Sequence, residues 1–272
     1  MSGYFAGRYY KHQKNGKTIC FIIGQADNGE FIQVITNDRI LQYDSLDSCH
    51  ADTGGLSIDL PDIQGAAVYG PLTPIRSDIM GPFRFLPMQC RHEVISLRHS
   101  LTGGFYVGGQ WIDLNGGIGY MEGDRGRSFP REYLWLHCND FSENCSIMAS
   151  VADIPLCGIH FTGCICVVFY RGREYRLATY CGVKIVAANK KQLTLSQGPL
   201  RLEAEMDVSR SHPLRAPKSG RMTETIHESN CTCAHFRFWS GGELLFDLKS
   251  ENCSFECNLH PGAGRRSPGP TA

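Results

Sequence analysis

Apolar and polar residues alternate with a period of two along much of this chain, in short runs that are separated by tight-turn signals. No stretch of a dozen residues keeps the 3.6-residue apolar period of an amphipathic helix. Between such runs lie five dipeptides that suit two-residue hairpin turns: Asn15-Gly16, Asn28-Gly29, Gly108-Gly109, Arg171-Gly172 and Gly241-Gly242. The pattern therefore predicts an all-β, antiparallel fold.

The length of the chain, 272 residues, allows more than one β-structured lobe. We expect two barrel or half-barrel lobes packed side by side, formed by residues 1–130 and 131–261. Residues 262–272 are rich in Gly, Pro and Arg, which predicts a disordered tail.

The charge balance excludes several classes of partner. Lys and Arg together number 27, as do Asp and Glu, so the chain as a whole has no net field that attracts nucleic acid, an anionic membrane surface or a polyanion. The sequence contains no Gly-x-Ser-x-Gly elbow, phosphate-binding loop or dinucleotide fingerprint, and we expect no cofactor. It also contains no apolar run of the length of a signal peptide or a membrane span, and we expect a cytoplasmic protein.

Thirteen cysteines, an odd number, lie mostly in apolar stretches, as reduced thiols that fill a core do. Same-face thiols two residues apart can chelate a metal, but structural zinc normally uses C-x2-C spacing. We expect no metal site at the close cysteine pairs, which are Cys164/Cys166, Cys231/Cys233 and Cys253/Cys257, the last followed by His260.

Two carboxylates are the candidate catalytic groups. In IGYMEGD, an extended backbone places Tyr120, Glu122 and Asp124 on one face. Neighbouring carboxyl groups raise the pKa of one of them, which can keep an acid protonated near pH 7. The alternative is that both acids form ion pairs that close one end of a barrel, with Arg125, Arg127 or Arg131.

The next aromatic run, EYLWLHCN, gives a candidate ligand-binding face: Tyr133, Trp135, His137 and Asn139. The opposite face, formed by Leu134, Leu136 and Cys138, is plain core. The first face suits either a cavity that holds a hydrocarbon chain and a polar head, or a half-exposed outer surface.

Three other segments offer single candidates. In EVISLRHSL, His99 shares a face with Ile95, Leu97 and Leu101, and it is either a hydrogen-bonded core residue or a group that orients or deprotonates a phenol. His92 lies just upstream. Trp239 shares a face with His235 and Arg237, and we expect this face to line the second lobe.

Four segments together resemble the tocopherol cyclase-like family: 3–24, 78–101, 119–141 and 161–185, with a weaker echo in 222–229. The most specific is GYMEGDRGRSFPREYLWLHCNDF (119–141), and the resemblance covers most of residues 3–257 in the family's order. One position departs from the family pattern, because Arg125 stands where the family usually has Trp. The family is distantly similar to carotenoid hydratases and other two-lobed lipocalin-like proteins, which implies lipocalin-like lobes around a cavity.

The resemblance implies a cofactor-independent, acid-catalysed cyclisation of a prenylated phenol, quinol or related isoprenoid. Glu122 or Asp124 would donate the proton, Tyr133 and Trp135 would stabilise the cation, and His99 or His137 would hold the hydroxyl group. The rival hypothesis is a non-catalytic carrier of a lipid or terpenoid. Either protein would bind a hydrophobic small molecule, with transient membrane contact for its uptake. The expected ligand-binding residues are His92, His99, Tyr120, Arg127, Tyr133, Trp135, His137, Asn139 and Trp239.

Overall fold

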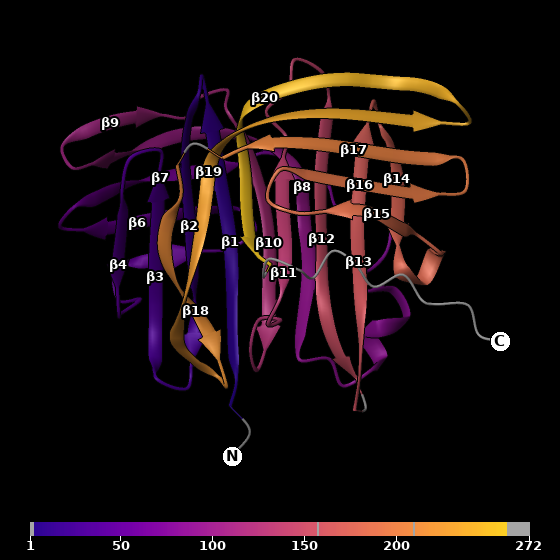
Figure 1. Ribbon diagram of the computed structural model, residues 1–272. Coiled ribbons are helices and arrows are strands. Elements are labelled where there is room, and N and C mark those ends of the chain that lie inside the picture. The colour runs from indigo at the N-terminus through magenta and orange to yellow at the C-terminus, as the bar shows by residue number, and fades with distance from the viewer. Residues whose placement is uncertain (1–2, 157, 209, 260–272) are drawn as a thin grey trace.

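The computed structural model describes residues 3–156, 158–208 and 210–259, and it confirms the expected all-β, antiparallel class. The strands form two ten-stranded sheets that lie side by side, and neither sheet closes into a barrel (Figure 1). The predicted tail, residues 262–272, lies outside the described residues.

The first sheet has the order β4-β3-β2-β1-β10-β8-β7-β6-β5, with β9 paired to β8. Its strands are β1 (Phe5–Lys14), β2 (Lys17–Ala26), β3 (Gly29–Thr36), β4 (Ile40–Tyr43), β5 (Cys49–Ala51), β6 (Gly55–Leu60), β7 (Ile63–Tyr69), β8 (Cys90–Val107), β9 (Gln110–Asp113) and β10 (Ile118–Gly126). A short 3-10 helix, η1 (Gly81–Phe85), precedes β8.

The second sheet has the order β14-β13-β12-β11-β20-β19-β17-β16-β15, with β18 paired to β19. Its strands are β11 (Tyr133–Cys138), β12 (Cys145–Leu156), β13 (Ile159–Tyr170), β14 (Arg173–Ala178), β15 (Lys184–Ala188), β16 (Gln192–Gln197), β17 (Leu200–Asp207), β18 (His212–Lys218), β19 (Arg221–Ser240) and β20 (Glu243–Asn258). A second 3-10 helix, η2 (Thr179–Cys181), follows β14.

Tight turns form at four of the five predicted dipeptides. Asn15 and Arg171 adopt positive φ angles of 50° and 49°, each followed by a glycine that also has positive φ, as a two-residue hairpin turn requires. The fifth prediction is wrong by one residue. Ala26 pairs with Gly29, so the turn consists of Asp27 and Asn28, and Gly29 begins β3.

Each sheet curls around its own hydrophobic core, and both cores are filled. Tyr10, Phe21 and Phe105 pack inside the first lobe, and Phe236 and Phe238 pack inside the second. A third buried cluster takes residues from both sheets and therefore lies between them. The sequence-based expectation placed a cavity within a lobe, but side chains occupy both lobe interiors.

Two exchanged segments hold the lobes together. The hairpin of β18 and β19 belongs to the second sheet but crosses over β1 to β3 of the first (Figure 1). There Gln33 Nε2 donates to Arg215 O at 2.9 Å, and Asn230 Nδ2 donates to Ile35 O. In return, residues 77–85 of the first half pack on the second sheet, where Tyr180 Oη donates to Ile79 O at 2.8 Å.

The cysteines found in the described residues are all free thiols, consistent with the expected reduced state. Cys164 and Cys166 lie in the core of the second lobe. His260 lies outside the described residues. The described part of the chain has no helix with the length and apolar character to cross a membrane.

Candidate functional site

A pocket lies between the two sheets and encloses about 820 Å³ of free space, its open mouth included. Its walls are mainly apolar and aromatic, with Met80, Phe83, Met88, Phe129 and Phe161 among them. Its polar groups come from both sheets: His92, Glu122 and Asp124 from the first, and Tyr133 and Glu256 from the second. A second pocket of about 550 Å³ adjoins it, and the two share Glu122, Asp124, Phe129, Trp135 and Glu256. These five side chains form the wall between the two chambers.

His92 holds the two acids of β10. Asp124 lies opposite His92 in the β8–β10 ladder, and His92 Nδ1 is 3.0 Å from Asp124 Oδ1. His92 Nε2 lies 3.2 Å from Glu122 Oε2, an ion-pair distance without the alignment of a hydrogen bond. Burial by itself lowers the pKa of His92, but the Glu122 and Asp124 carboxylates outweigh it and raise that pKa well above its usual value. The two carboxylates therefore favour the protonated form of the partly buried His92 ring.

A second acidic group consists of Glu228 and Glu256, and Glu256 is part of the same wall. The two residues are directly opposite each other on β19 and β20, and their carboxyl groups are within hydrogen-bonding reach. Burial raises the pKa of Glu256 to about 7, and burial together with the Glu256 charge raises the pKa of Glu228 well above its usual value. Attraction to the buried Lys11 ammonium lowers the pKa of Glu228 but does not outweigh these effects. Two adjacent carboxyl groups with raised pKa values can share a proton near neutral pH.

Tyrosines from both sheets fix the positions of this pair. Tyr133 Oη donates to Glu256 Oε2 at 2.7 Å, and Tyr9 Oη donates to Glu228 Oε1 at 2.8 Å. Tyr9 also packs edge-on against Trp135, with ring centroids 5.5 Å apart. Because Tyr9 is on β1, this contact ties the first sheet to the carboxyl pair of the second.

Five of the predicted site residues meet at this chamber: Glu122, Asp124, His92, Tyr133 and Trp135. Tyr120, predicted to share their face, lies behind the wall, where its hydroxyl donates to Glu122 Oε2 at 2.5 Å. The predicted alternative partners of the acids, the nearby arginines, do not hold them. Arg125 instead pairs with Glu93, and both of those side chains are about half exposed.

Both faces of β11 are buried, so the half-exposed alternative for this strand is wrong. Leu134, Leu136 and Cys138 enter the core of the second lobe, and Tyr133 and Trp135 enter the cluster between the lobes. The strand parity predicted from the sequence is confirmed here.

The other predicted ligand-binding residues lie away from the chamber. His137 stacks on Tyr120 with ring centroids 3.5 Å apart, and Asn139 donates to the Leu97 and Gly119 carbonyls. His99 contacts Ser96 and the Tyr69 ring inside the first lobe. Burial lowers the pKa values of His99, to about 4, and of His137, as expected for neutral core histidines.

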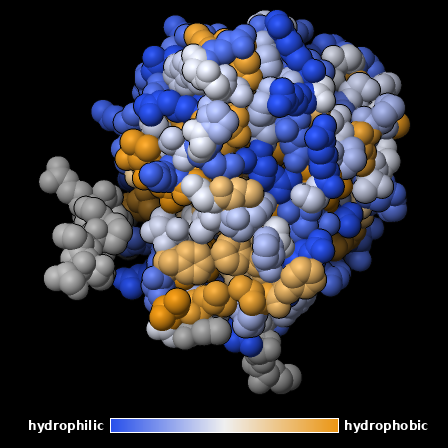
Figure 2. All heavy atoms as spheres, turned by 90° about the vertical axis from the view of Figure 1, so that its right-hand side faces the viewer, coloured by the Kyte–Doolittle hydropathy of each residue, from blue (hydrophilic) through white to orange (hydrophobic). Residues whose placement is uncertain are grey.

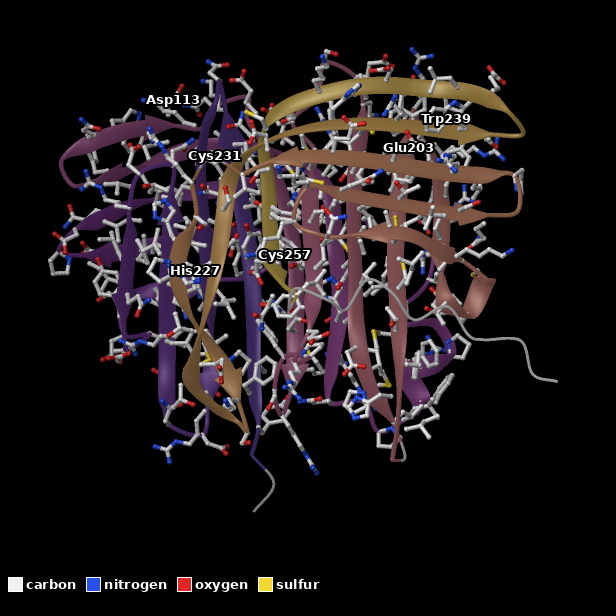
Figure 3. All side chains as sticks on the ribbon, viewed as in Figure 1. Asp113, Glu203, His227, Cys231, Trp239 and Cys257 are labelled. Carbon is white, nitrogen blue, oxygen red and sulfur yellow. The ribbon has the colours of Figure 1, made fainter. Side chains whose placement is uncertain are left out.

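Arg127 is exposed in the connection between the sheets. Trp239 does not line the second lobe. Its face of β19 includes Arg237, which pairs with Glu203 and Glu205, whereas Phe236 and Phe238 point inward. Figure 3 shows Trp239 near Glu203 at the upper right, while Cys257, the neighbour of Glu256, lies near the middle of the molecule. The sequence gives the alternation on this strand correctly but not which face points inward.

Irregular pairing of β8 with β10 explains a further difference. The register shifts between Gly119 and Met121 and again between Met121 and Glu122. As a result, Leu97 packs between the lobes, but Leu101 packs inside the first lobe, although simple alternation places them on one face.

The carboxyl pair and Tyr9 were not identified from the sequence. Glu228 lies in the segment that carries the weak family echo, and Glu256 interrupts the apolar run CSFEC. A carboxylate within such a run is a signal of a buried acid. What the sequence does not show is that β19 and β20 bring the two side chains together.

The group formed by His92, Glu122 and Asp124 also has the composition of a metal site. One nitrogen and two oxygen donors lie within 4.8 Å of one another. Such donors suit zinc and other divalent transition metals, which bind the deprotonated imidazole. In the structure one carboxylate oxygen lies within 3.2 Å of each ring nitrogen of His92, and these charges raise the pKa of the imidazole.

Comparisons with known proteins bear on the fold. Neither a protein-family model nor a curated protein matches this sequence. Among solved structures, CghA aligns with a TM-score of 0.63 and 8% identity, over 95% of this chain and 89% of CghA. A protein from Nitrosomonas europaea described as an AttH aligns over 95% of this chain and 92% of its own, with 10% identity and a TM-score of 0.48. The chain therefore shares the fold of CghA, and the resemblance to tocopherol cyclase-like proteins has no support from these sequence comparisons.

Proposed function

We propose that this protein is a cofactor-independent, tocopherol cyclase-like enzyme that cyclises a prenylated phenol or quinol by acid catalysis. The observation that carries the proposal is the Glu228–Glu256 pair, two neighbouring carboxyl groups with raised pKa values at the wall of an apolar, aromatic chamber. Protonation of an unactivated alkene needs an acid that is still protonated near neutral pH, and burial supplies one here.

Glu256 is the proton donor in this proposal, because it lines both chambers, whereas Glu228 is fully buried behind it. The proton-donor role thus moves from Glu122 and Asp124, which contact His92, to a pair whose pKa values are raised by burial. The Glu256 carboxyl proton passes to one alkene carbon and leaves a tertiary carbocation on the other. The phenol oxygen attacks that carbon, and the phenol proton returns to the Glu256 carboxylate, so the product has the mass of the substrate.

The cation forms beside aromatic and anionic groups. Trp135, Tyr133 and Phe129 offer ring faces or edges in the chamber, and the Glu122 and Asp124 carboxylates contribute negative charge. Trp135 Nε1 is buried and has no protein acceptor among the described residues, so it can donate to the ligand's oxygen. In this proposal Trp135 holds the hydroxyl group of the ligand, a role that the resemblance gave to His99 or His137. Arg125 pairs with Glu93 rather than lining the chamber, so the replacement of the family's Trp leaves this lining intact.

The test is incubation with a prenylated hydroquinone, followed by chromatography and mass spectrometry. We expect a cyclised product of unchanged mass. Glu256→Gln keeps the shape of the side chain but has no acidic proton, and it should reduce turnover by about 100-fold or more. Ligand affinity, followed by quenching of tryptophan fluorescence, should change little. Glu251→Gln, on the same strand but exposed, is the matched control and should behave as the unaltered protein.

Tight binding without turnover by the unaltered protein would instead identify a non-catalytic carrier. The same apolar chamber supports that alternative, because a carrier needs the lining and not the acid. Equal loss of affinity and turnover in Glu256→Gln would show that Glu256 is structural and would refute its role as donor.

A further inference from the structure

We infer that the rim of the chamber is a docking surface for an anionic lipid membrane. Three segments form this rim and contribute to the chamber lining: residues 80–91, residues 127–132, and residues 153–156 with 158–162. Their outward side carries large apolar side chains. Phe85 is 75% exposed and Ile159 is 64% exposed.

The apolar residues of the rim are continuous with the chamber. Phe83, next to the exposed Phe85, contacts Phe161 with ring centroids 5.8 Å apart, and both line the pocket. In Figure 1 the ends of η1, β12 and β13 lie together at the lower right. Figure 2 shows hydrophobic atoms gathered in the lower part of that side of the molecule. A ligand that leaves a membrane at this surface meets apolar side chains along its whole route inward.

The charge of the rim identifies the kind of membrane. The three segments contain four arginines, Arg84, Arg91, Arg127 and Arg131, against two acids, Glu132 and Asp153. None of these arginines is ion-paired among the described residues, and Asp153 is already paired with His160. The chain as a whole is neutral, with 27 residues of each sign, so the excess of positive charge at this rim is local.

Aromatic and aliphatic tips surrounded by arginines are what an interfacial contact with anionic lipid requires. The apolar tips enter the headgroup region, and the guanidinium groups pair with lipid phosphates and carboxylates. Arg84 lies over the Phe85 ring at 4.6 Å, so the two groups are presented together. This contact goes beyond the proposed reaction and also suits a carrier, because either protein must collect a ligand that dissolves poorly in water.

The test is flotation of the full-length protein with vesicles of phosphatidylcholine alone, or of phosphatidylcholine mixed with phosphatidylserine. We expect binding to the mixed vesicles and at least tenfold less binding to phosphatidylcholine alone. Replacement of both rim residues, Phe85→Ser with Ile159→Ser, should reduce binding at least tenfold, and Arg84→Gln should reduce it severalfold. The matched controls are Val68→Ser, an exposed residue of the first sheet, and Arg173→Gln at the start of β14; both should bind normally.

Hydrogen exchange gives a second measurement that does not depend on substitution. Vesicles should protect the amides of residues 83–87 and 158–160 and leave those of β5 and β6 unchanged. The inference is overturned if the unaltered protein does not float with mixed vesicles, if both vesicle types bind equally, or if the control variants lose as much binding as the rim variants. None of these measurements involves turnover, so they are independent of the proposed reaction.

Discussion

The two acidic groups at the chamber wall each contain two carboxyl groups, yet the partners of those carboxyl groups differ. Glu122 and Asp124 flank His92, and their charges raise the pKa of its imidazole. Glu228 and Glu256 accept hydrogen bonds from Tyr9 and Tyr133, and burial raises the pKa of both, despite the attraction of the Lys11 ammonium to Glu228. The difference teaches that burial alone does not determine the state of an acid. The protonation of an acid also depends on the group closest to its carboxyl, and in both cases that group comes from another strand.

The largest expected effect comes from removal of the cation. His92→Leu leaves two buried carboxylates uncompensated, and we expect a loss of about 3 to 5 kcal/mol in the free energy of unfolding at pH 7. Urea denaturation measures it. His235→Leu breaks a more exposed pair with Asp247 and should lose at most about 1 kcal/mol. Equal losses in the two variants would contradict the difference between the buried and exposed groups.

The second prediction concerns the pH dependence of turnover. Glu256 is active when protonated, and its pKa is raised to about 7, so turnover should fall about tenfold per pH unit above 7. The Asp124 charge is one of the causes that raise this pKa, after burial. Asp124→Asn should therefore move the midpoint of the pH profile downward. A midpoint that stays in place or rises would contradict the electrostatic effect of Asp124 on the pKa of Glu256.

A smaller effect of opposite sign is expected at Glu228. The pKa of Glu228 is higher in the folded than in the unfolded chain. Its contribution to the free energy of unfolding is therefore fully present below the unfolded pKa, and it is lost as the pH rises from that value through the folded pKa. Glu228→Gln keeps an acceptor for Tyr9 and removes the titration. The variant should gain about 1 kcal/mol or more relative to the unaltered protein at pH 8, and less at pH 5. Denaturation at the two pH values measures this difference, and a loss at pH 8 would contradict it.

The smallest expected effect is that of metal removal. If the imidazolium of His92 occupies the space between Glu122 and Asp124, treatment with EDTA should leave turnover and stability unchanged. Measurement before and after dialysis against the chelator tests this. A loss that zinc restores would show that the first acidic group is a metal site instead.

Local patterns gave the fold class and much of the strand parity. Two-residue turns are determined by the dipeptides that tolerate positive φ, so hairpins such as Asn15-Gly16 could be predicted from the sequence. The alternation of side chains along β11 likewise placed Trp135 and Leu134 on opposite faces of the strand. It failed along β8, where irregular pairing with β10 changes the register, a feature that depends on the partner strand.

The candidate site divides in the same way. The sequence by itself placed Glu122 and Asp124 on one face, because residues two apart on a strand always point to the same side. Only the tertiary structure decided their partners, since His92 comes from β8 and the second carboxyl pair from β19 and β20. It also placed the chamber between two filled lobes, because the two sheets meet along surfaces that no local period reveals. Long-range strand pairing determines which polar groups become neighbours, and through them which acid keeps its proton.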